Sequence, residues 1–271
     1  MAAGTIRAGI GGWIFEPWRG SFYPAKLSKT QELAHASRQI PTIEINSTFY
    51  RTQSPSTFAK WAREVPEGFV FSLKAVRYAT QKRVLAEAGE SVDRFVKSGI
   101  VELGDKLGPI LWQFADKKAF QPDDFAAFLK LLPSSVEGHA LRHAVELRHA
   151  SFLDPQAVRL AREAGVAIVY AQDEDYAEIA DVTGDFVYAR LQKGRDEIET
   201  GYELKALDEW AERARLWAAG DAPGDLPLML PDEPARKTPR DVFVYFIREG
   251  KSRAPQAAMA LMERINAHQR S

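Results

Sequence analysis

Polar and ionisable side chains stand at the ends of five apolar segments of this sequence. The segments read Ile43–Asn46, Phe71–Lys74, Leu111–Gln113, Val145–Arg148 and Tyr188–Gln192. In each one, apolar and polar residues alternate, which is typical of a strand with one apolar and one partly polar face. Their side chains include carboxylates and a lysine that can transfer protons, and arginines that can hold anionic groups.

Strands and helices that could position these residues alternate along the whole chain. Stretches rich in Val, Ile, Phe and Tyr predict eight strands, at Ile6–Gly11, Thr42–Ser47, Phe69–Ala75, Pro109–Phe114, His143–Arg148, Val166–Ala171, Phe186–Leu191 and Asp241–Ile247. Helices are expected at Ser28–Arg38, Pro55–Glu64, Ser91–Glu102, Asp123–Leu132, Asp154–Glu163, Tyr176–Asp181, Glu203–Ala219 and Ala254–Ala267. This alternation predicts an α/β protein with a single (β/α)8 TIM-type barrel domain over residues 1–271. The proline-rich stretch at about 220–240 is expected to be an irregular surface connection.

The alternative architecture is an open doubly wound sheet. That fold usually carries a G-x-G-x-x-G turn after a strand, followed by an acidic residue that binds a ribose. The sequence has no such turn, so the barrel is favoured.

A closed barrel would bring the polar strand ends together at one mouth, where barrel enzymes place their active sites. The residues expected to act in catalysis are Glu44, Lys74 and Glu146, and those expected to bind a ligand are Trp13, Asn46, Tyr50, Gln113, Arg148, Arg190 and Lys251. Inward-facing Gly9 and Gly11 would leave room for a ligand or for a close approach of two backbones. The structural alternative is a salt-bridged lumen whose ion pairs only fix the register of the strands.

Two loops could complete such a site. The first, Gly12–Gly20, is rich in aromatic residues, and Trp13 or Trp18 could stack on a sugar or a base. Both could instead plug one end of the barrel, an interpretation favoured for Trp18. The second loop, Arg248–Arg253, places Gly, Lys and Ser before a helix, where backbone amides could cradle a phosphate.

Composition limits the classes of protein that fit. Lys and Arg number 36 against 37 Asp and Glu, so no global basic field points to nucleic acid as a partner. The absence of cysteine excludes thiolate chemistry and cysteine-ligated metals, and Glu44, Glu146, Asp173 and His149 lack a recognised metal-ligand spacing. No cofactor motif, signal peptide or membrane-spanning stretch is evident, so we expect a cytoplasmic protein.

One block of this sequence, Glu44-Ile45-Asn46-Ser47-Thr48-Phe49-Tyr50-Arg51, resembles the YecE-like proteins, domain-of-unknown-function family 72 (DUF72). Further matches are Gly12-Trp13, Trp18-Arg19-Gly20, Phe71-Ser72-Leu73-Lys74, Glu146-Leu147-Arg148-His149 and Tyr188-Ala189-Arg190-Leu191. The resemblance implies a TIM-type barrel and no particular reaction. This chain differs where Gln81, Gln192, Lys193 and Arg248 stand at positions that are often His, His, Gly and Asn in the family, and Gly220–Arg240 looks longer than usual.

The leading hypothesis is an enzyme that acts on a small anionic or polar metabolite, phosphorylated or sugar-like. Its chemistry would be carboxylate and lysine acid–base catalysis, in the hydrolase, lyase or isomerase class. The alternatives are a barrel that processes or binds nucleic acid and a barrel that binds a ligand without catalysis.

Overall fold

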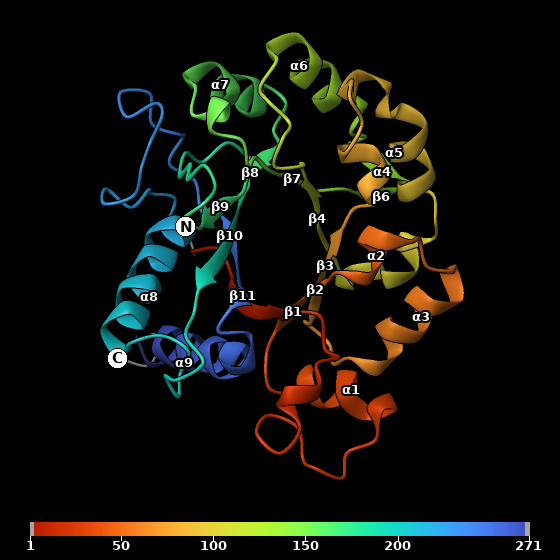
Figure 1. The fold of residues 1–271 in the computed structure, drawn as a ribbon, viewed down its shortest axis with the longest axis vertical. Coiled ribbons are helices and arrows are strands. Elements are labelled where there is room, and N and C mark those ends of the chain that lie inside the picture. The colour runs from red at the N-terminus through yellow and green to blue at the C-terminus, as the bar shows by residue number, and fades with distance from the viewer. Residues whose placement is uncertain (1–2, 269–271) are drawn as a thin grey trace.

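The parallel sheet of the protein closes on itself through the two halves of one strand. In the computed structural model, which describes residues 3–268, the strand order is β8-β7-β4-β3-β2-β1-β11-β10-β9. The two end strands, β8 (Ala167–Ile168) and β9 (Tyr170–Gln172), are separated only by Val169. Val169 donates its amide to the Val145 carbonyl at 2.9 Å, so the sixth predicted strand bridges the gap and completes the ring (Figure 1).

The predicted TIM-type barrel is therefore confirmed, with nine strand segments where eight were predicted because the sixth strand is divided. The two N-terminal and three C-terminal residues of the predicted 1–271 domain lie outside the described residues. No helix among residues 3–268 has the length and apolarity needed to cross a bilayer.

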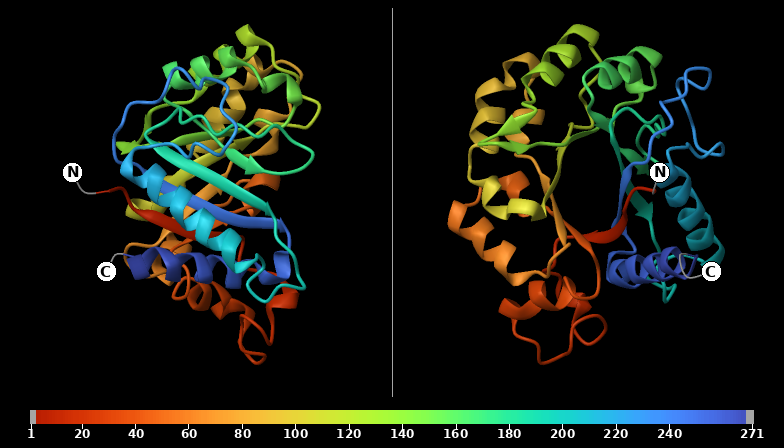
Figure 2. Two further views of the ribbon diagram at one scale, coloured as in Figure 1. Left: turned by 90° about the vertical axis from the view of Figure 1, so that its left-hand side faces the viewer. Right: turned by 180° about the vertical axis from the view of Figure 1, so that it is seen from behind.

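Helices surround the ring of strands on its outer side (Figures 1 and 2). The other barrel strands are β1 (Ile6–Gly11), β2 (Thr42–Ile45), β3 (Val70–Lys74), β4 (Leu107–Gln113), β7 (His143–Glu146), β10 (Phe186–Lys193) and β11 (Asp241–Glu249). The helices are α1 (Glu32–Ala36), α2 (Ser47–Tyr50), α3 (Pro55–Glu64), α4 (Arg77–Thr80), α5 (Gly89–Val96), α6 (Pro122–Leu131), α7 (Pro155–Glu163), α8 (Leu204–Ala219) and α9 (Ala254–His268). Short 3-10 helices cover Glu16–Trp18, Lys29–Gln31, Leu85–Ala88, Ile100–Lys106, Ala150–Phe152 and Lys251–Arg253.

Two apolar layers hold the barrel, because alternate residues of each strand face opposite sides of the sheet. The outer layer packs strand residues such as Ile43, Leu73 and Trp112 against the helices. The inner layer fills the lumen with Leu111, Phe186, Tyr188, Phe243, Tyr245 and their neighbours. The lumen is thus a packed core below its polar end.

Gly9 shows how closely two strands approach within this lumen. A Cβ atom at this position would lie 2.0 Å from the carbonyl oxygen of Thr42 on β2. The inward-facing glycines were predicted to leave room either for a ligand or for a close approach of two backbones. Gly9 has the second of these roles.

The helix predicted at Tyr176–Asp181 is wrong, because tertiary contacts use the polar groups of this segment. The Ala180 amide bonds to the Pro227 carbonyl, and the Asp181 carboxylate accepts the amides of Met229 and Leu230 at 2.7 and 3.0 Å. The connection at 220–240, blue in Figure 1 beside α7 and α8, contains no helix or strand.

A small hairpin outside the barrel was not predicted from the sequence. Strands β5 (Ser135–Val136) and β6 (His139–Ala140) pair antiparallel around Glu137 and Gly138. Both turn residues have positive φ, as the tight two-residue hairpin turn requires. Glu-Gly is a weak signal for that turn, because glutamate rarely adopts this conformation.

Candidate functional site

A polar cavity of about 230 Å³ lies at the carboxyl ends of the strands, and we call it the mouth cavity. The predicted site residues that line it are Asn46, Lys74, Gln113, Arg148, Arg190 and Lys251. They come from five different strand ends and from the turn before α9. The parallel sheet therefore brings most of the predicted set together, as the shared phase of the strands required.

Arg190 ties two carboxylates together beneath this cavity. Its guanidinium donates to Glu44 Oε1 at 3.0 Å and to Glu146 Oε2. All three side chains are buried, and the second oxygen of Glu44 accepts the Tyr188 hydroxyl at 2.7 Å. Both predicted catalytic carboxylates thus have partners on β10.

Glu146 has the densest set of donors in the site. Its Oε1 accepts Gln113 Nε2 at 2.9 Å and Arg148 Nε at 2.7 Å, in addition to the Arg190 contact on Oε2. Burial alone would raise the pKa of Glu146, but the charges of Arg190 and Arg148 outweigh it and hold that pKa at about 2. At neutral pH, Glu146 is a fixed anion and not a proton donor.

Like Lys251, Lys74 is a cation of this site without a carboxylate partner among the described residues. Within residues 3–268, no carboxylate oxygen lies within 4 Å of its Nζ, which stands 4.2 Å from the ring centre of Phe49. Burial lowers the pKa of Lys74 from 10.5 to about 8, with the charge of Arg190 adding to the effect. A lysine of this kind is partly neutral near physiological pH and can accept a proton or attack a carbonyl.

The Asn-Ser-Thr-Phe-Tyr-Arg block explains how this amine is positioned. Asn46 directly follows β2, and α2 begins at the next residue, so the chain turns over the end of β3. The Thr48 hydroxyl bonds to the backbone carbonyls of Lys74 at 2.7 Å and of Ile45 at 3.0 Å. The turn therefore ties the ends of β2 and β3 together and places the Phe49 ring beside the amine.

The rim of the cavity holds ion pairs that the sequence did not reveal. Arg148 bonds to Asp116 at 2.9 Å and lies 4.4 Å from the Tyr176 ring centre. Arg248, in a left-handed conformation with φ 64°, bonds to Asp173 and to Asp175. These partners stand in loops far apart in the sequence, so no local pattern could pair them.

Trp13 and Tyr50 do not line the mouth cavity, although both were predicted ligand contacts. The Trp13 ring packs edge-on against Trp61 at 5.2 Å, on the outer side of the sheet. Tyr50 is 64% exposed on α2 and lines a separate surface depression. Trp18 lines the cavity instead, and its indole donates to the Lys251 carbonyl at 2.9 Å.

Asp196 occupies the place where a phosphate was expected before α9. Its Oδ1 accepts the backbone amide of Ser252 at 3.1 Å. A carboxylate therefore meets the amide that a phosphate would use. Lys251 still faces the mouth cavity, with its Nζ 4.4 Å from the Phe15 ring centre, and burial lowers its pKa.

The acidic residues near the mouth have partners other than a metal ion. Glu44 and Glu146 bond to Arg190, and Asp173 bonds to Arg248. Among residues 3–268, no group of three His, Cys, Asp or Glu side chains is arranged to hold a metal ion.

The family of the chain follows from comparison with known proteins. A family model described as "Protein of unknown function DUF72" matches residues 7–271. The chain belongs to the DUF72 family. Two solved DUF72 structures, from Enterococcus faecalis and Thermotoga maritima, each have a TM-score of 0.69 with 19% and 21% sequence identity. The alignments cover 97% of this chain and 96% of the first structure, and 98% of this chain and all of the second.

A curated relative in the sequence comparison is similar over a shorter stretch. The UPF0759 protein YunF of Bacillus subtilis is 29% identical over 114 residues, which cover 40% of this chain. The match spans 39% of the length of YunF. The DUF72 description assigns no reaction to the family.

Proposed function

We propose that the protein is an enzyme that acts on a small polar or anionic metabolite in the mouth cavity, with Lys74 as the proton-transferring amine. The observation that carries this proposal is the partly buried Lys74, whose pKa of about 8 leaves a neutral fraction at physiological pH. A structural lysine would be paired with a carboxylate, whereas this one faces an open polar cavity. Strongly shifted pKa values in a cleft are typical of functional groups.

The carboxylates then have a positioning role. Glu146 stays ionised far below neutral pH, and both glutamates hold Arg190 in place under the cavity floor. Arg190 in turn keeps positive charge near Lys74 and so helps to lower the pKa of its amine. Arg190 therefore supports the reactivity of Lys74, the two glutamates position Arg190 while partly opposing its effect on the pKa of Lys74, and in this proposal none of the three transfers the proton.

The amides and rim arginines would recognise the substrate. Gln192 Nε2 is buried beside the cavity and has no hydrogen-bond partner within the described residues, so a ligand oxygen could accept from it. Asn46 and Gln113 could bind hydroxyl or carbonyl groups, and Arg148 and Arg248 could attract an anionic group. The cavity volume of about 230 Å³ suits a small metabolite.

The reaction class follows from what a neutral amine can do. It can remove a proton from a carbon beside a carbonyl, or add to the carbonyl with loss of water to form a Schiff base. Isomerases and lyases use both steps, so these classes fit the site better than hydrolysis. We place this activity in the cytoplasm as part of the same proposal.

The test is a search for turnover in a complex mixture of metabolites. A bacterial small-molecule extract is incubated with the wild type, with Lys74→Met and with Lys205→Met, and followed by mass spectrometry. Lys205 is a matched control because its side chain is 90% exposed on α8. We expect at least one compound to change with the wild type and the control, and not with Lys74→Met. No change at all, or changes that persist in Lys74→Met, would refute the proposal.

An exposed aromatic surface favours a second function, the binding of single-stranded nucleic acid. Tyr50 and Tyr78 are 64% and 59% exposed, and the Arg77 guanidinium lies 6.0 and 5.5 Å from their ring centres. Bases stack on such rings, with cations holding the phosphates. Fluorescence anisotropy with labelled single-stranded DNA would test this function, and Tyr50→Ala with Tyr78→Ala should weaken any binding while Lys74→Met leaves it intact.

A further inference from the structure

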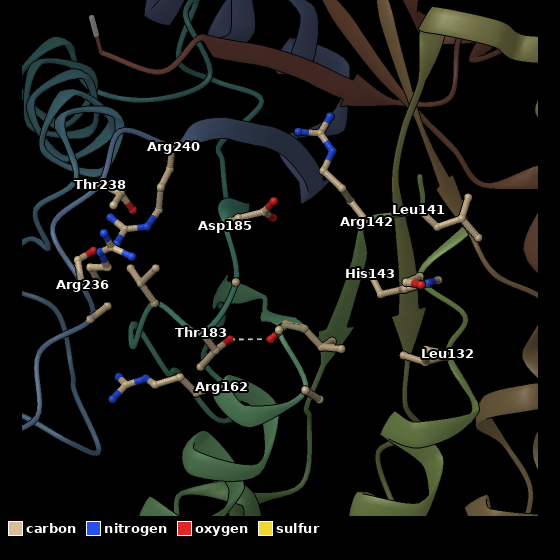
Figure 3. A pocket seen from close by; sticks show the side chains of 17 residues that line it. Leu132, Leu141, Arg142, His143, Arg162, Thr183, Asp185, Arg236, Thr238 and Arg240 are labelled. Carbon is tan, nitrogen blue, oxygen red and sulfur yellow. Dashed lines mark hydrogen bonds between the residues drawn. The ribbon is translucent and has the colours of Figure 1, made fainter. Parts of the chain in front are cut away.

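A second and larger cavity, of about 570 Å³, lies at the opposite end of the barrel (Figure 3). His143 begins β7, and Asp185 and Arg240 directly precede β10 and β11, so the cavity sits at the amino ends of the strands. Its outer wall is the end of the connection at 220–240, and α7 contributes Arg162. No part of the mouth cavity reaches this site.

Positive charge dominates the lining of this amino-end cavity. Four arginines line it, Arg142, Arg162, Arg236 and Arg240, against the single carboxylate of Asp185. Figure 3 shows Arg162, Arg236 and Arg240 on one side and Arg142 on the other. Arg142 is neutralised by Asp241 at 3.0 Å, outside the lining. The arginines on the other side carry the excess charge.

Arg240 and Arg162 have hydrogen-bond donors that nothing in the described chain satisfies. Arg240 is only 4% exposed, yet no carboxylate lies within 4 Å of it among residues 3–268. Its Nη2 bonds to the Arg236 carbonyl, while its Nη1 is buried without a partner. Arg162 donates Nη1 to the Glu233 carbonyl at 2.9 Å, and its Nε is also buried and unsatisfied. A buried guanidinium without an anion is costly, and a bound anion would remove that cost.

The rest of the lining distinguishes this cavity from a simple ion site. Leu132, Leu141, Val166 and Val182 form an apolar part of the wall. His143 is not available to a ligand as a charged group, since its Nδ1 accepts the Trp112 indole at 3.0 Å and its Nε2 bonds to the Pro133 carbonyl at 2.7 Å. A ligand would therefore find guanidinium groups on one side and an apolar surface beside them.

We propose that the amino-end cavity binds a phosphorylated small molecule, with Arg240 and Arg162 holding the phosphate and the apolar wall contacting the rest. A guanidinium group can donate two parallel hydrogen bonds to two oxygens of one phosphate. A phosphate also carries about two negative charges, so it matches the excess positive charge better than a single carboxylate does. The volume is within the range of metabolite sites. This site is independent of the reaction proposed for the mouth.

The test uses inorganic pyrophosphate as the probe and isothermal titration calorimetry at constant ionic strength. The wild type should bind one pyrophosphate, and Arg240→Met and Arg162→Gln should each weaken binding about tenfold or more, the loss expected for a charge-assisted contact. Lys237→Met is the matched control, because Lys237 stands on the same connection, is 78% exposed and pairs with Asp221. It should bind as the wild type does, and so should Lys74→Met.

Three results would overturn the proposal. The first is that the wild type does not bind pyrophosphate. The second is that Lys237→Met loses as much affinity as the arginine variants, which would show diffuse attraction. The third is that only Lys74→Met loses affinity, which would place the anion at the mouth. Thermal melts without pyrophosphate check the fold. Arg240→Met should melt at or above the wild-type temperature, because it removes an unpaired buried charge, and added pyrophosphate should stabilise it less than it stabilises the wild type and Lys237→Met.

Discussion

The amine of Lys74 should lose its proton near pH 8. Burial disfavours the ammonium form, and the charge of Arg190 acts in the same direction, while Glu44 and Glu146 oppose both. At pH 7.5, a lysine of pKa about 8 is neutral in roughly a quarter of the molecules, whereas an ordinary lysine is neutral in about one in a thousand. The proposed reaction depends on this difference, because it requires a neutral amine at physiological pH.

The same shift in pKa predicts how stability depends on pH. The pKa is 10.5 for an ordinary lysine and about 8 in the folded protein. Below pH 8 the amine is protonated in both the folded and the unfolded state. The folded state then bears the full free-energy cost of burying the ammonium group, which is at most about 3 kcal/mol. Between pH 8 and 10.5 the folded protein has released the proton and the unfolded chain still holds it, so this cost disappears as the pH rises. Lys74→Met should therefore raise the free energy of unfolding at pH 7 by about 1–3 kcal/mol, and the gain should vanish above pH 10.5.

Nuclear magnetic resonance of protein whose lysines carry ¹³C-labelled methyl groups measures the pKa directly. Lys74→Met identifies the resonance, and its chemical shift between pH 6 and pH 11 gives the pKa, to be compared with the ordinary lysine value of about 10.5. Urea unfolding of the wild type and Lys74→Met at pH 7 and pH 10 measures the linked stability. If Lys74 titrates at the ordinary lysine value of about 10.5 and Lys74→Met loses stability at pH 7, the amine is paired or exposed in solution, and its role as a base is refuted.

Three further substitutions test the interactions around the site. Glu44→Gln should lower the free energy of unfolding by about 3 kcal/mol, because it leaves half of the Arg190 charge uncompensated, and Tyr188→Phe should lower it by about 1.5–3 kcal/mol through loss of one hydrogen bond to the Glu44 carboxylate. Urea melts measure both, and an unchanged Glu44→Gln would show that the buried ion pair does not form. Gly9→Ala should cost about 2–3 kcal/mol in the same assay, because its Cβ would meet a carbonyl of β2 at 2.0 Å, while Gly224→Ala, with open space around it, should be neutral.

The sequence predicted those parts of the site that depend on strand phase. Glu44, Lys74, Glu146 and Arg190 are all lumen-facing positions near the ends of parallel strands, and parallel strands end at one edge of a barrel. Period-two alternation and the order of the strands therefore sufficed to place them together.

The loops could not be predicted in the same way. Trp13 and Trp18 belong to one aromatic loop, and Trp18 reaches the cavity because the loop folds back through bonds from Arg19 to the Leu27 carbonyl and to Glu32. Such long-range contacts leave no periodic trace in the sequence. Nor could the sequence show that Arg190, one of the predicted ligand contacts, is neutralised by the two glutamates.

Arg190 also connects strands that are not neighbours in the sheet. Its two carboxylate partners stand on β2 and β7, each separated from β10 by other strands of the ring. Backbone ladders fix the spacing between adjacent strands, but a ring of such ladders could still flatten into an ellipse. The ion pairs of Arg190 cross the interior of the barrel to two other strands, and they oppose that distortion. Loops at this end of the barrel could therefore differ in length and sequence among relatives while the surface on which a substrate would rest keeps its shape.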